Sequence, residues 1–555
     1  MSNQPKILIV GGVAGGASAA TRARRCDEHA EITIFEKDGY VSFANCGLPY
    51  YLGGEIVDRE KLLVAKPSLF ENRFRIQVRV RHEITRINRI KKEVEGIDRA
   101  TGETFVEPYD KLILAPGAAP IVPDIPGADA DNVFALRNVE DTDRIKSFLE
   151  ARQPKRAVVV GAGFIGLEMV EQFHHLAMAV DVVEIAPQLL APLDPEMAAL
   201  VEESLRKHGV GVYMGTGLKA LHCEGGAVTG VVLESGVGLP ADMVVLGMGV
   251  RPATALARAA GLEIGPMGGI TINNVCQTND PDIYAAGDAV EYPSTFADTP
   301  MRVPLAGPAN RAGRTAGEHA ATGHARPIGR VQGSAIVRVF DITAASTGLS
   351  EKLASRLGRA SASVIVSGAN HAGYYPGAER LVLKLIYDPA GGRVLGAQAA
   401  GGAGVDKRID IIATALNFGA TVYDLATLDL CYAPPFGSAK DPVHMAAFVA
   451  CNHLDGLTPI VPPRFDLAGV QLVDVRTDEE VACMRLPGAI HIPVEQLRSE
   501  LSRLDPALPT AVLCHSGLRS HIGARILAQH GFAQVVNVSG GMFMQQYARP
   551  ESVER

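Results

Sequence analysis

The chain has 555 residues, of which 47% are hydrophobic and 21% charged. This balance excludes a disordered or collagen-like chain and predicts about three or four globular domains. The net charge of −8 and the absence of tryptophan argue against a nucleic-acid partner, and no apolar stretch is long enough to span a bilayer. The N-terminus has no signal-like segment, so we expect a cytoplasmic protein without a membrane partner.

The eight cysteines are spread along the chain, and none forms a C-x-x-C pair. This spacing disfavours a zinc ribbon or a local redox disulfide, and we predict no metal site. In a reducing compartment, a cysteine with a special role is expected to act as a single thiol.

The N-terminal segment has the pattern strand, glycine turn, helix, strand. Residues 6–10 form an apolar run typical of a buried parallel strand, and they enter the turn GGVAGG at 11–16. The next strand, 31–36, ends in Glu36, at the distance where an acid binds a ribose hydroxyl in a dinucleotide fold. The turn is a degraded G-x-G-x-x-G motif, because Val13 takes the place of the middle glycine.

A second unit of the same kind follows about 150 residues later. A strand at 157–160 leads into a full G-x-G-x-x-G at 161–166, a helix at 167–176 and a strand at 180–184 that ends in Glu184. Such glycines let the backbone approach a pyrophosphate, which the N–H groups at the helix N-terminus bind. Two units in one chain indicate two dinucleotides.

Three further strands are predicted around these units. The segments 111–127 and 242–252 are apolar strands that run into glycine or proline, and 282–290 is a strand that ends in Gly287 and Asp288. An aspartate after a glycine at a strand end is suited to hold a ribityl or ribose hydroxyl.

The second half of the chain has a different hydrophobic pattern. Residues 330–450 contain period-two stretches such as 381–388 and a helix at 406–419, which predict a separate α+β domain. The proline-bearing segment 453–467 reads as a linker. After it come strands at 471–476 and 511–516, a helix, and a strand at 535–538.

Over residues 5–450 the chain resembles the flavoprotein disulfide reductases that carry two dinucleotide-binding domains. The resemblance implies FAD in the first unit and NADH or NADPH in the second, with Glu184 favouring NADH because an acid repels a 2′-phosphate. It implies FAD contacts at Gly11, Gly15, Gly16, Glu36, Ala115, Gly117, Gly287 and Asp288, nicotinamide-nucleotide contacts at Gly161, Gly163, Gly166, Glu184 and Gly249, and further cofactor contacts at Val13, Ala14, Lys37, Phe164, Ile165, Pro304 and Ala306.

The segment 42–51, SFANCGLPYY, contains one cysteine, Cys46, where many members of that family have two. It resembles the single-cysteine subgroup that includes coenzyme A-disulfide reductases and related NADH oxidases and peroxidases. The resemblance implies that Cys46 is the catalytic thiol beside the flavin, where it forms a charge-transfer pair or a mixed disulfide with coenzyme A.

The coenzyme A-disulfide reductases suggest further sites in the second half of the chain. In them, one tyrosine from each of two segments reaches across a homodimer interface to the thiol, which implies catalytic roles for Tyr374 and Tyr432, with Tyr375 as the alternate. The active site would then be shared between two subunits. Residues expected at the coenzyme A and thiol-substrate site are Arg22, Arg25, Ser42, Asn45, Lys66, Tyr375 and Lys440, with a solvated basic face as the alternative for the two arginines.

Residues 465–555 resemble a rhodanese domain in four ordered segments, among them LVDVR at 472–476 and CHSGLRS at 514–520. The loop that starts at Cys514 runs toward a helix predicted to start near Ser520, so its N–H groups form an anion-binding nest. Such a nest lowers a thiol pKa and stabilises a persulfide. We therefore predict catalytic roles for Cys514 and Arg519.

The predicted fold class is α/β, with two Rossmann-like dinucleotide-binding domains, an α+β dimerisation domain and a C-terminal α/β rhodanese domain. The expected boundaries are 1–115 with 280–325 for the FAD domain, 116–279 for the NAD(P)H domain, 326–452 for dimerisation, 453–467 for the linker and 468–555 for the rhodanese domain.

A flavoprotein that handles coenzyme A thiols, fused to a persulfide carrier, suggests an FAD-dependent NAD(P)H oxidoreductase. We expect it to reduce coenzyme A disulfide, coenzyme A persulfide or polysulfide through Cys46 and bound coenzyme A, while Cys514 delivers sulfane sulfur. One alternative is an NADH oxidase or peroxidase in which Cys46 cycles through sulfenic acid. Another is a redox-sensing interaction protein.

Overall fold

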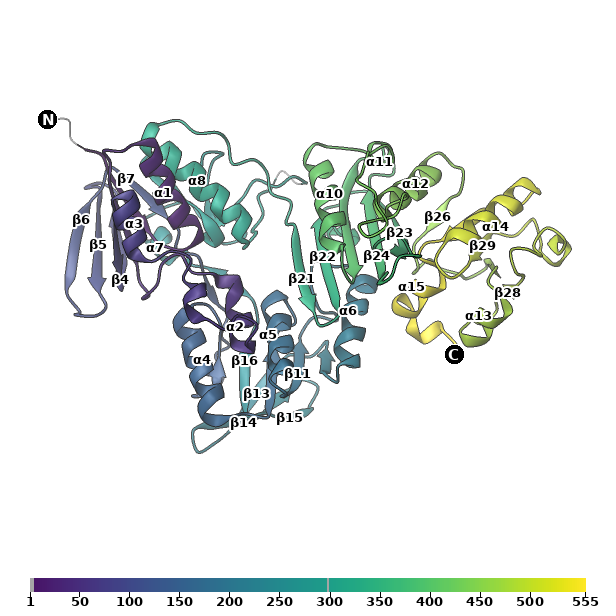
Figure 1. The fold of residues 1–555 in the computed structure, drawn as a ribbon, viewed down its shortest axis with the longest axis horizontal. Coiled ribbons are helices and arrows are strands. Elements are labelled where there is room, and N and C mark those ends of the chain that lie inside the picture. The colour runs from purple at the N-terminus through teal and green to yellow at the C-terminus, as the bar shows by residue number, and fades with distance from the viewer. Residues whose placement is uncertain (1–3, 297–298) are drawn as a thin grey trace. The chain divides into compact units, whose positions relative to one another are not determined.

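The computed structural model describes residues 4–296 and 299–555. Its chain forms two compact units, Met1–Pro187 with Gly209–Gly333 and Gln188–His208 with Ser334–Arg555. Helices and strands both occur throughout the described part of the chain, and the main sheets of the dinucleotide units and of the C-terminal region are parallel (Figure 1), which confirms the predicted α/β class. No helix in the described part of the chain is long and apolar enough to cross a membrane.

The first unit contains a five-stranded parallel sheet in the order β19-β7-β1-β2-β3. The first two predicted strands are confirmed, and the turn between them opens helix α1. The elements of this layer are β1 (Lys6–Val10), β2 (Glu31–Glu36), β3 (Ile76–Val80), β7 (Lys111–Leu114), β19 (Ile283–Ala285), α1 (Ala14–Cys26), α3 (Pro67–Phe74), α7 (Ala255–Ala259) and α8 (Ala306–Thr322).

Helices α1 and α8 pack closely because glycines line their contact. A Cβ atom on Gly313 would lie 2.1 Å from the carbonyl oxygen of Gly15, and one on Gly317 would lie 2.2 Å from that of Ala19. A larger residue at either position would force the helices apart. The start of α8 is therefore held beside the glycine turn of α1.

A second parallel sheet of the first unit has the order β12-β11-β10-β16-β9. Helix α5 starts at Phe164 rather than at the predicted residue 167, because Gly163 already occupies the N-cap position. Helix α2 packs against α5. The elements are β9 (Val133–Phe134), β10 (Arg156–Val160), β11 (Ala179–Glu184), β12 (Gly211–Met214), β16 (Met243–Leu246), α2 (Leu48–Gly53), α4 (Val139–Arg152) and α5 (Phe164–His175).

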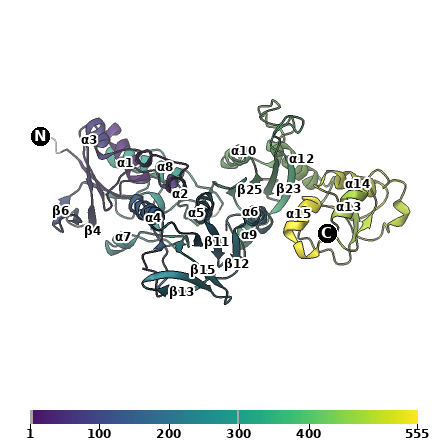
Figure 2. The same cartoon turned by 60° about the horizontal axis from the view of Figure 1, so that its bottom comes forward.

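Smaller antiparallel sheets extend both layers, and the sheet that contains β13 and β15 is seen best in Figure 2. Their strands are β4 (His82–Asn88), β5 (Glu93–Asp98), β6 (Thr104–Pro108), β13 (Leu218–Glu224), β14 (Ala227–Leu233) and β15 (Gly238–Pro240). Two short pairs complete the unit, β8 (Ala118–Pro120) with β17 (Val250–Pro252) and β18 (Ile270–Thr271) with β20 (Val290–Glu291).

The second unit opens with an antiparallel sheet in the order β21-β22-β25-β24-β23, as expected for the α+β region. The predicted strand 381–388 and helix 406–419 correspond to β24 and α10. The elements are β21 (Ala335–Val339), β22 (Ile342–Gly348), β23 (Ala362–Ala369), β24 (Arg380–Tyr387), β25 (Val394–Gly401), α6 (Pro195–Lys207), α9 (Glu351–Arg356), α10 (Val405–Asn417), α11 (Val422–Ala426) and α12 (Pro442–Leu454).

The C-terminal region forms a third parallel sheet in the order β26-β30-β29-β27-β28. Strand β26 lies inside the segment 453–467 that reads as a linker, and it pairs with β30. The elements are β26 (Ile460–Val461), β27 (Gln471–Asp474), β28 (Ile490–His491), β29 (Thr510–Leu513), β30 (Val535–Val538), α13 (Asp478–Cys483), α14 (Leu518–Gln529) and α15 (Gly541–Ala548).

A buried lysine ties helix α6 to the antiparallel sheet of the second unit. Lys384 on β24 is fully buried, and its Nζ lies 2.8 Å from a carboxylate oxygen of Asp194 and 2.5 Å from carboxylate oxygens of Glu196 and Glu351. Burial opposes the charge, but the carboxylates outweigh it and hold the pKa of Lys384 above its ordinary value. Removing the lysine would leave buried negative charges without a partner.

We expect Lys384→Met to destabilise the second unit by about 3–5 kcal/mol, the usual cost of breaking a buried ion pair from one side. Lys207→Met is a matched control on α6, because Lys207 is exposed and lies 3.3 Å from a carboxylate oxygen of Glu203; it should cost less than about 1 kcal/mol. The measurement is urea unfolding followed by circular dichroism. Equal midpoints for the two variants would contradict the assignment.

Candidate active site

The two dinucleotide units of the first unit share one turn geometry. Gly11 and Gly161 have positive φ values of 93° and 109°. The N–H of Gly11 donates to the carbonyl oxygen of Phe35 at 2.8 Å, and that of Gly161 donates to Val183 at 2.7 Å. Each turn therefore bends the chain away from its strand and directs the N-terminus of the following helix, where N–H groups lack helical partners, toward a ligand.

The last glycine of each motif packs against the first. A Cβ atom would lie 1.8 Å from the carbonyl oxygen of Gly11 if placed on Gly16, and 1.9 Å from that of Gly161 if placed on Gly166. The middle position is different, because a Cβ on Gly163 meets nothing within 4 Å. Val13 stands at the equivalent place with a φ of −93°. The degraded N-terminal motif is thus compatible with the turn.

The acids at the ends of β2 and β11 brace these turns in the same way. Glu36 accepts the N–H of Gly12 at 2.8 Å, and Glu184 accepts that of Ala162 at 2.8 Å. Burial raises the pKa of Glu36, against the lowering effect of its backbone hydrogen bonds. A carboxylate has further lone pairs that suit ribose hydroxyls. Glycine cradle and acid together fit a dinucleotide in each unit.

Cys46 lies in a short 3-10 turn directly before α2 and is exposed. The side-chain amide of its neighbour Asn45 donates to the carbonyl oxygen of Arg137 at 3.0 Å and accepts from Nη1 of Arg137 at 2.8 Å. Arg137 also lies 3.6 Å from a carboxylate oxygen of Asp288. One arginine thus connects the cysteine turn to the predicted flavin contact after β19, and Gly117 leaves room for it.

Two carboxyl groups oppose ionisation of Cys46. Although the residue as a whole is exposed, surrounding protein atoms partly desolvate its sulfur, and this raises the pKa of the thiol most; the charges of Glu168 and Asp288 raise it further. Glu168, on α5, accepts a hydrogen bond from the Tyr50 hydroxyl at 3.3 Å, and burial raises its pKa to about 7. Glu168 therefore gains its negative charge near neutral pH, and this charge raises the pKa of Cys46.

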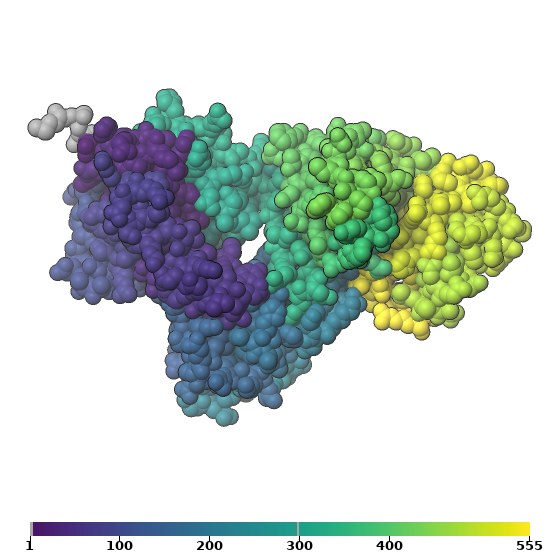
Figure 3. Space-filling model, in the orientation of Figure 1, coloured from purple at the N-terminus to yellow at the C-terminus, as the bar shows by residue number. Residues whose placement is uncertain are grey.

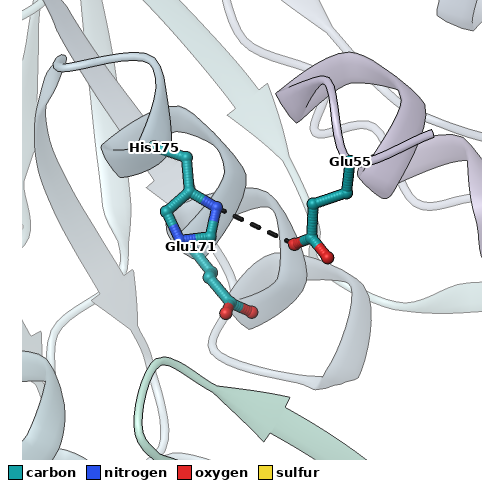
Figure 4. A group of neighbouring side chains, drawn as sticks. All are labelled: Glu55, Glu171 and His175. Atoms are coloured by element: carbon teal, nitrogen blue, oxygen red, sulfur yellow. Dashed lines mark ion pairs between the residues drawn. The ribbon is translucent and has the colours of Figure 1, made fainter. Parts of the chain in front are cut away.

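A second set of contacts holds α2 against α5. His175 Nδ1 lies 3.8 Å from Glu55 Oε1, beside Glu171 one helical turn earlier (Figure 4). The amide of Gln172 donates to the same Glu55 oxygen at 3.0 Å. These contacts, with that of Tyr50, fix the helix that follows Cys46 onto the helix that starts at the second glycine turn.

Cys514 is buried in the loop between β29 and α14. Its Sγ accepts the N–H of Gly517 at 3.0 Å and lies 3.3 Å from the hydroxyl oxygen of Ser520. Helix α14 starts at Leu518, two residues before the predicted start near Ser520, because Gly517 with a φ of 116° is its N-cap. The sulfur thus lies at a helix N-terminus, which favours an anion there.

Three family models match the chain in order. They are the pyridine nucleotide-disulphide oxidoreductase model over residues 5–309, its dimerisation domain over 334–442 and a rhodanese-like domain over 464–544. The chain belongs to the pyridine nucleotide-disulphide oxidoreductase family. It is therefore an NAD(P)H-dependent flavoprotein reductase with a dimerisation domain and a rhodanese domain, as the sequence predicted.

Similar proteins agree with this family. A coenzyme A disulfide reductase of Staphylococcus aureus strain JH9 is 36% identical over 446 residues, which is 80% of this chain and 100% of the relative. The crystal structure of reduced Bacillus anthracis CoADR-RHD has a TM-score of 0.96 at 43% identity and covers 100% of both chains. A NAD-dependent persulfide reductase from A. fulgidus has a TM-score of 0.90 at 38% identity, over 97% of this chain and 99% of its own.

The residues predicted for coenzyme A are placed in different ways. Arg22 donates to a carboxylate oxygen of Glu318 at 3.0 and 2.8 Å, whereas Arg25 is exposed. The Nζ atom of Lys66 lies 2.5 Å from a carboxylate oxygen of Glu60. The N–H of Ser42 donates to Gly12 at 2.9 Å, which places Ser42 beside the first glycine turn. The exposed Lys440 belongs to the second unit.

The two predicted tyrosines lie together in the second unit. The hydroxyl oxygens of Tyr374 and Tyr432 are 3.1 Å apart, and the side chains are exposed. The hydrogen bond to Tyr432 raises the pKa of Tyr374. Tyr375 packs edge-on against His371, with ring centres 5.7 Å apart. Cys46 lies in the other unit of the chain.

Sequence reasoning missed the polar partners of both cysteines. Arg137 carries no motif signal, whereas Glu168 lies two residues after the last glycine of G-x-G-x-x-G, in the first turns of α5. Arg519 was predicted alone, but its guanidinium donates to both carboxylate oxygens of Glu480, at 2.6 and 2.7 Å. This pairing lowers the pKa of Glu480 to about 2. Glu480 closes a capping box with Thr477, which is readable in sequence.

We expect Glu168→Gln to shift alkylation of Cys46 to lower pH. Above about pH 7 the wild-type carboxylate opposes the thiolate, and the neutral amide does not. The measurement is the rate of iodoacetamide labelling of Cys46 against pH in the FAD-loaded protein, read by peptide mass spectrometry. Glu150→Gln, an exposed position on α4, is the control. A profile of Glu168→Gln that matches this control would contradict the coupling.

Proposed function

We propose that the chain uses NADH to reduce coenzyme A disulfide, coenzyme A persulfide or polysulfide at Cys46, and that Cys514 delivers sulfane sulfur to this reaction. The observation that carries the proposal is the presence of two separate thiol sites in one reductase. Cys46 adjoins the dinucleotide units, whereas Cys514 lies in an anion-binding loop of the rhodanese domain. The names of the coenzyme A disulfide reductase and persulfide reductase relatives support these substrate classes.

The chemistry assigned to Cys46 is thiol–disulfide exchange. Its thiolate attacks coenzyme A disulfide, one S–S bond breaks, and coenzyme A thiolate leaves as a mixed disulfide forms. With coenzyme A persulfide, attack on the inner sulfur gives the same mixed disulfide and releases hydrosulfide. FAD, when bound, supplies the two electrons from NADH that cleave the mixed disulfide to two thiols. Cys46 must exchange a proton in this cycle, and Glu168, which accepts a hydrogen bond from Tyr50 and whose charge raises the pKa of Cys46, is the candidate partner.

The proposal includes a homodimer. The match to the dimerisation-domain model supports it, and the exposed pair of Tyr374 and Tyr432 provides two hydroxyl donors for a departing thiolate of a second subunit. Glu184 supports NADH over NADPH, because its carboxylate stands at the end of β11 where a 2′-phosphate would lie.

Two substitutions separate the thiol sites. Cys46→Ser should retain FAD and its reduction by NADH but lose turnover of coenzyme A disulfide and polysulfide, because the attacking thiol is gone. Cys514→Ser should lose sulfur transfer from thiosulfate and be strongly slowed with polysulfide, yet reduce coenzyme A disulfide at nearly the wild-type rate. The measurement is steady-state NADH oxidation with each substrate, together with a sulfur-transfer assay.

Polysulfide turnover that persists in Cys46→Ser would overturn the role of Cys46. Full polysulfide turnover in Cys514→Ser would mean that the rhodanese domain serves a separate reaction, and equal losses on all substrates would mean that it only supports the reductase structurally. Cys483→Ser, at an exposed cysteine of the same domain, is the control and should behave as wild type.

We expect Glu184→Ala to narrow the preference for NADH over NADPH. The substitution removes a ribose hydrogen bond and a like-charge repulsion, together worth roughly 1–3 kcal/mol, or about 5- to 150-fold in the ratio of kcat/KM values. The check is the ratio measured for both nucleotides with one acceptor. An unchanged ratio of kcat/KM values would mean that Glu184 does not distinguish the ribose hydroxyl of NADH from the 2′-phosphate of NADPH.

A further inference from the structure

Helix α15 of the rhodanese domain holds the Cys514 loop from behind. The N–H of Met542 donates to the carbonyl oxygen of Cys514 at 2.7 Å, and the N–H of Phe543 donates to that of His515 at 3.0 Å. A Cβ atom on Gly541 would lie 2.4 Å from the Cys514 carbonyl oxygen, so the helix start fits closely against the loop. The start of α15 therefore helps to fix the position of the loop that carries Cys514.

The same helix contacts the dimerisation domain within the second unit. The Ser539 hydroxyl, just before α15, accepts the N–H of Ile365 on β23 at 2.7 Å. The Tyr547 hydroxyl donates to Glu203 on α6 at 2.6 Å. Figures 1 and 2 show α15 on the side of the rhodanese domain nearest α6 and β23, and in Figure 3 the yellow atoms of the rhodanese domain adjoin the green atoms of the dimerisation domain. The Cys514 loop is thus braced by a second domain.

Arg380 of the dimerisation domain reaches this contact. It is the first residue of β24, and its guanidinium carbon lies 4.3 Å from the ring centre of Phe543. Phe543 in turn packs beside His515, with ring centres 6.1 Å apart. Burial lowers the pKa of His515, and the positive charge of Arg380 is the next cause of that shift. The charge of Arg380 therefore contributes to the lowered pKa of His515, the residue that follows Cys514.

The arginines of the rhodanese domain nearest the loop are already neutralised. Arg519 forms two hydrogen bonds with Glu480, and Arg476 is paired with buried Asp474 at 2.6 Å. Arg380 has no ion pair within the described ranges 4–296 and 299–555. This exposed cation stacks on Phe543, whose ring packs beside His515 of the Cys514 loop, and its charge suits an anionic sulfur donor.

We propose that Arg380 is a positioning residue of the sulfur-transfer site, where it favours anionic sulfane donors and the Cys514 persulfide through the Phe543–His515 contact. The inference rests on the proposed role of Cys514 as sulfur carrier. In the transfer step the Cys514 thiolate attacks the sulfane sulfur of thiosulfate, the S–S bond of thiosulfate breaks, and sulfite leaves with the bonding electron pair. Both reactants are anions, so a nearby cation lowers the cost of bringing them together.

The test is Arg380→Met, which keeps an unbranched apolar side chain that can still pack on Phe543 and removes the charge. In the full-length holoenzyme we expect the KM for thiosulfate to rise roughly three- to tenfold with a smaller change in kcat. Labelling of Cys514 by iodoacetamide at a fixed pH should be slower than in the wild type. Arg380→Lys should restore much of both effects, and NADH-driven reduction of coenzyme A disulfide should stay at the wild-type rate. Arg503→Met is the control, because Arg503 is exposed and its Nη1 lies 3.8 Å from a carboxylate oxygen of its chain neighbour Glu500.

The outcomes separate this inference from the proposed function. If wild type and Cys514→Ser transfer sulfur equally, the proposed role of Cys514 fails, while the labelling rate of Cys514 in Arg380→Met still tests the charge. If wild type transfers sulfur and Arg380→Met matches it in KM and in labelling, the inference is overturned. The same holds if Arg380→Lys is as defective as Arg380→Met, since packing and not charge would then be the cause.

Discussion

Backbone N–H groups at the carboxyl ends of parallel strands govern all three sites of this chain. Each of β1, β10 and β29 ends in a tight turn and leads into a helix, so N–H groups without a helical partner converge at one place. Such a place attracts negative charge, whether pyrophosphate or thiolate. The positive φ values of Gly11, Gly161 and Gly517 make these turns possible.

The two thiols occupy opposite electrostatic surroundings. Burial and the charges of Glu168 and Asp288 raise the pKa of Cys46, whereas Cys514 accepts a backbone N–H at a helix start. A raised pKa keeps the Cys46 thiol protonated in the resting site, so the proposed attack on a disulfide requires that this proton be removed at the site. A sulfur held by N–H groups suits the storage of an anionic persulfide. The difference supports a division of labour between the domains.

Coupling between the domains of the second unit depends on a few directional contacts. Helix α15 holds the Cys514 loop with its N-terminal N–H groups and contacts β23, β24 and α6 through side chains. The buried Lys384 fixes α6 against the same antiparallel sheet. The segment that reads as a linker adds strand β26 to the rhodanese sheet. The rhodanese domain is therefore braced rather than only tethered.

The sequence by itself determined the strands, the glycine turns, the family and the two cysteines of interest. These features are local: a parallel strand needs a short apolar run, and a tight turn needs glycine at fixed positions. It did not reveal Arg137 beside Asn45, Glu480 beside Arg519 or Arg380 beside Phe543, and it placed the start of α14 two residues late. Only the tertiary structure decided these, because charge and hydrogen-bond partners far apart in the chain are selected by three-dimensional packing, which leaves no periodic signal in sequence.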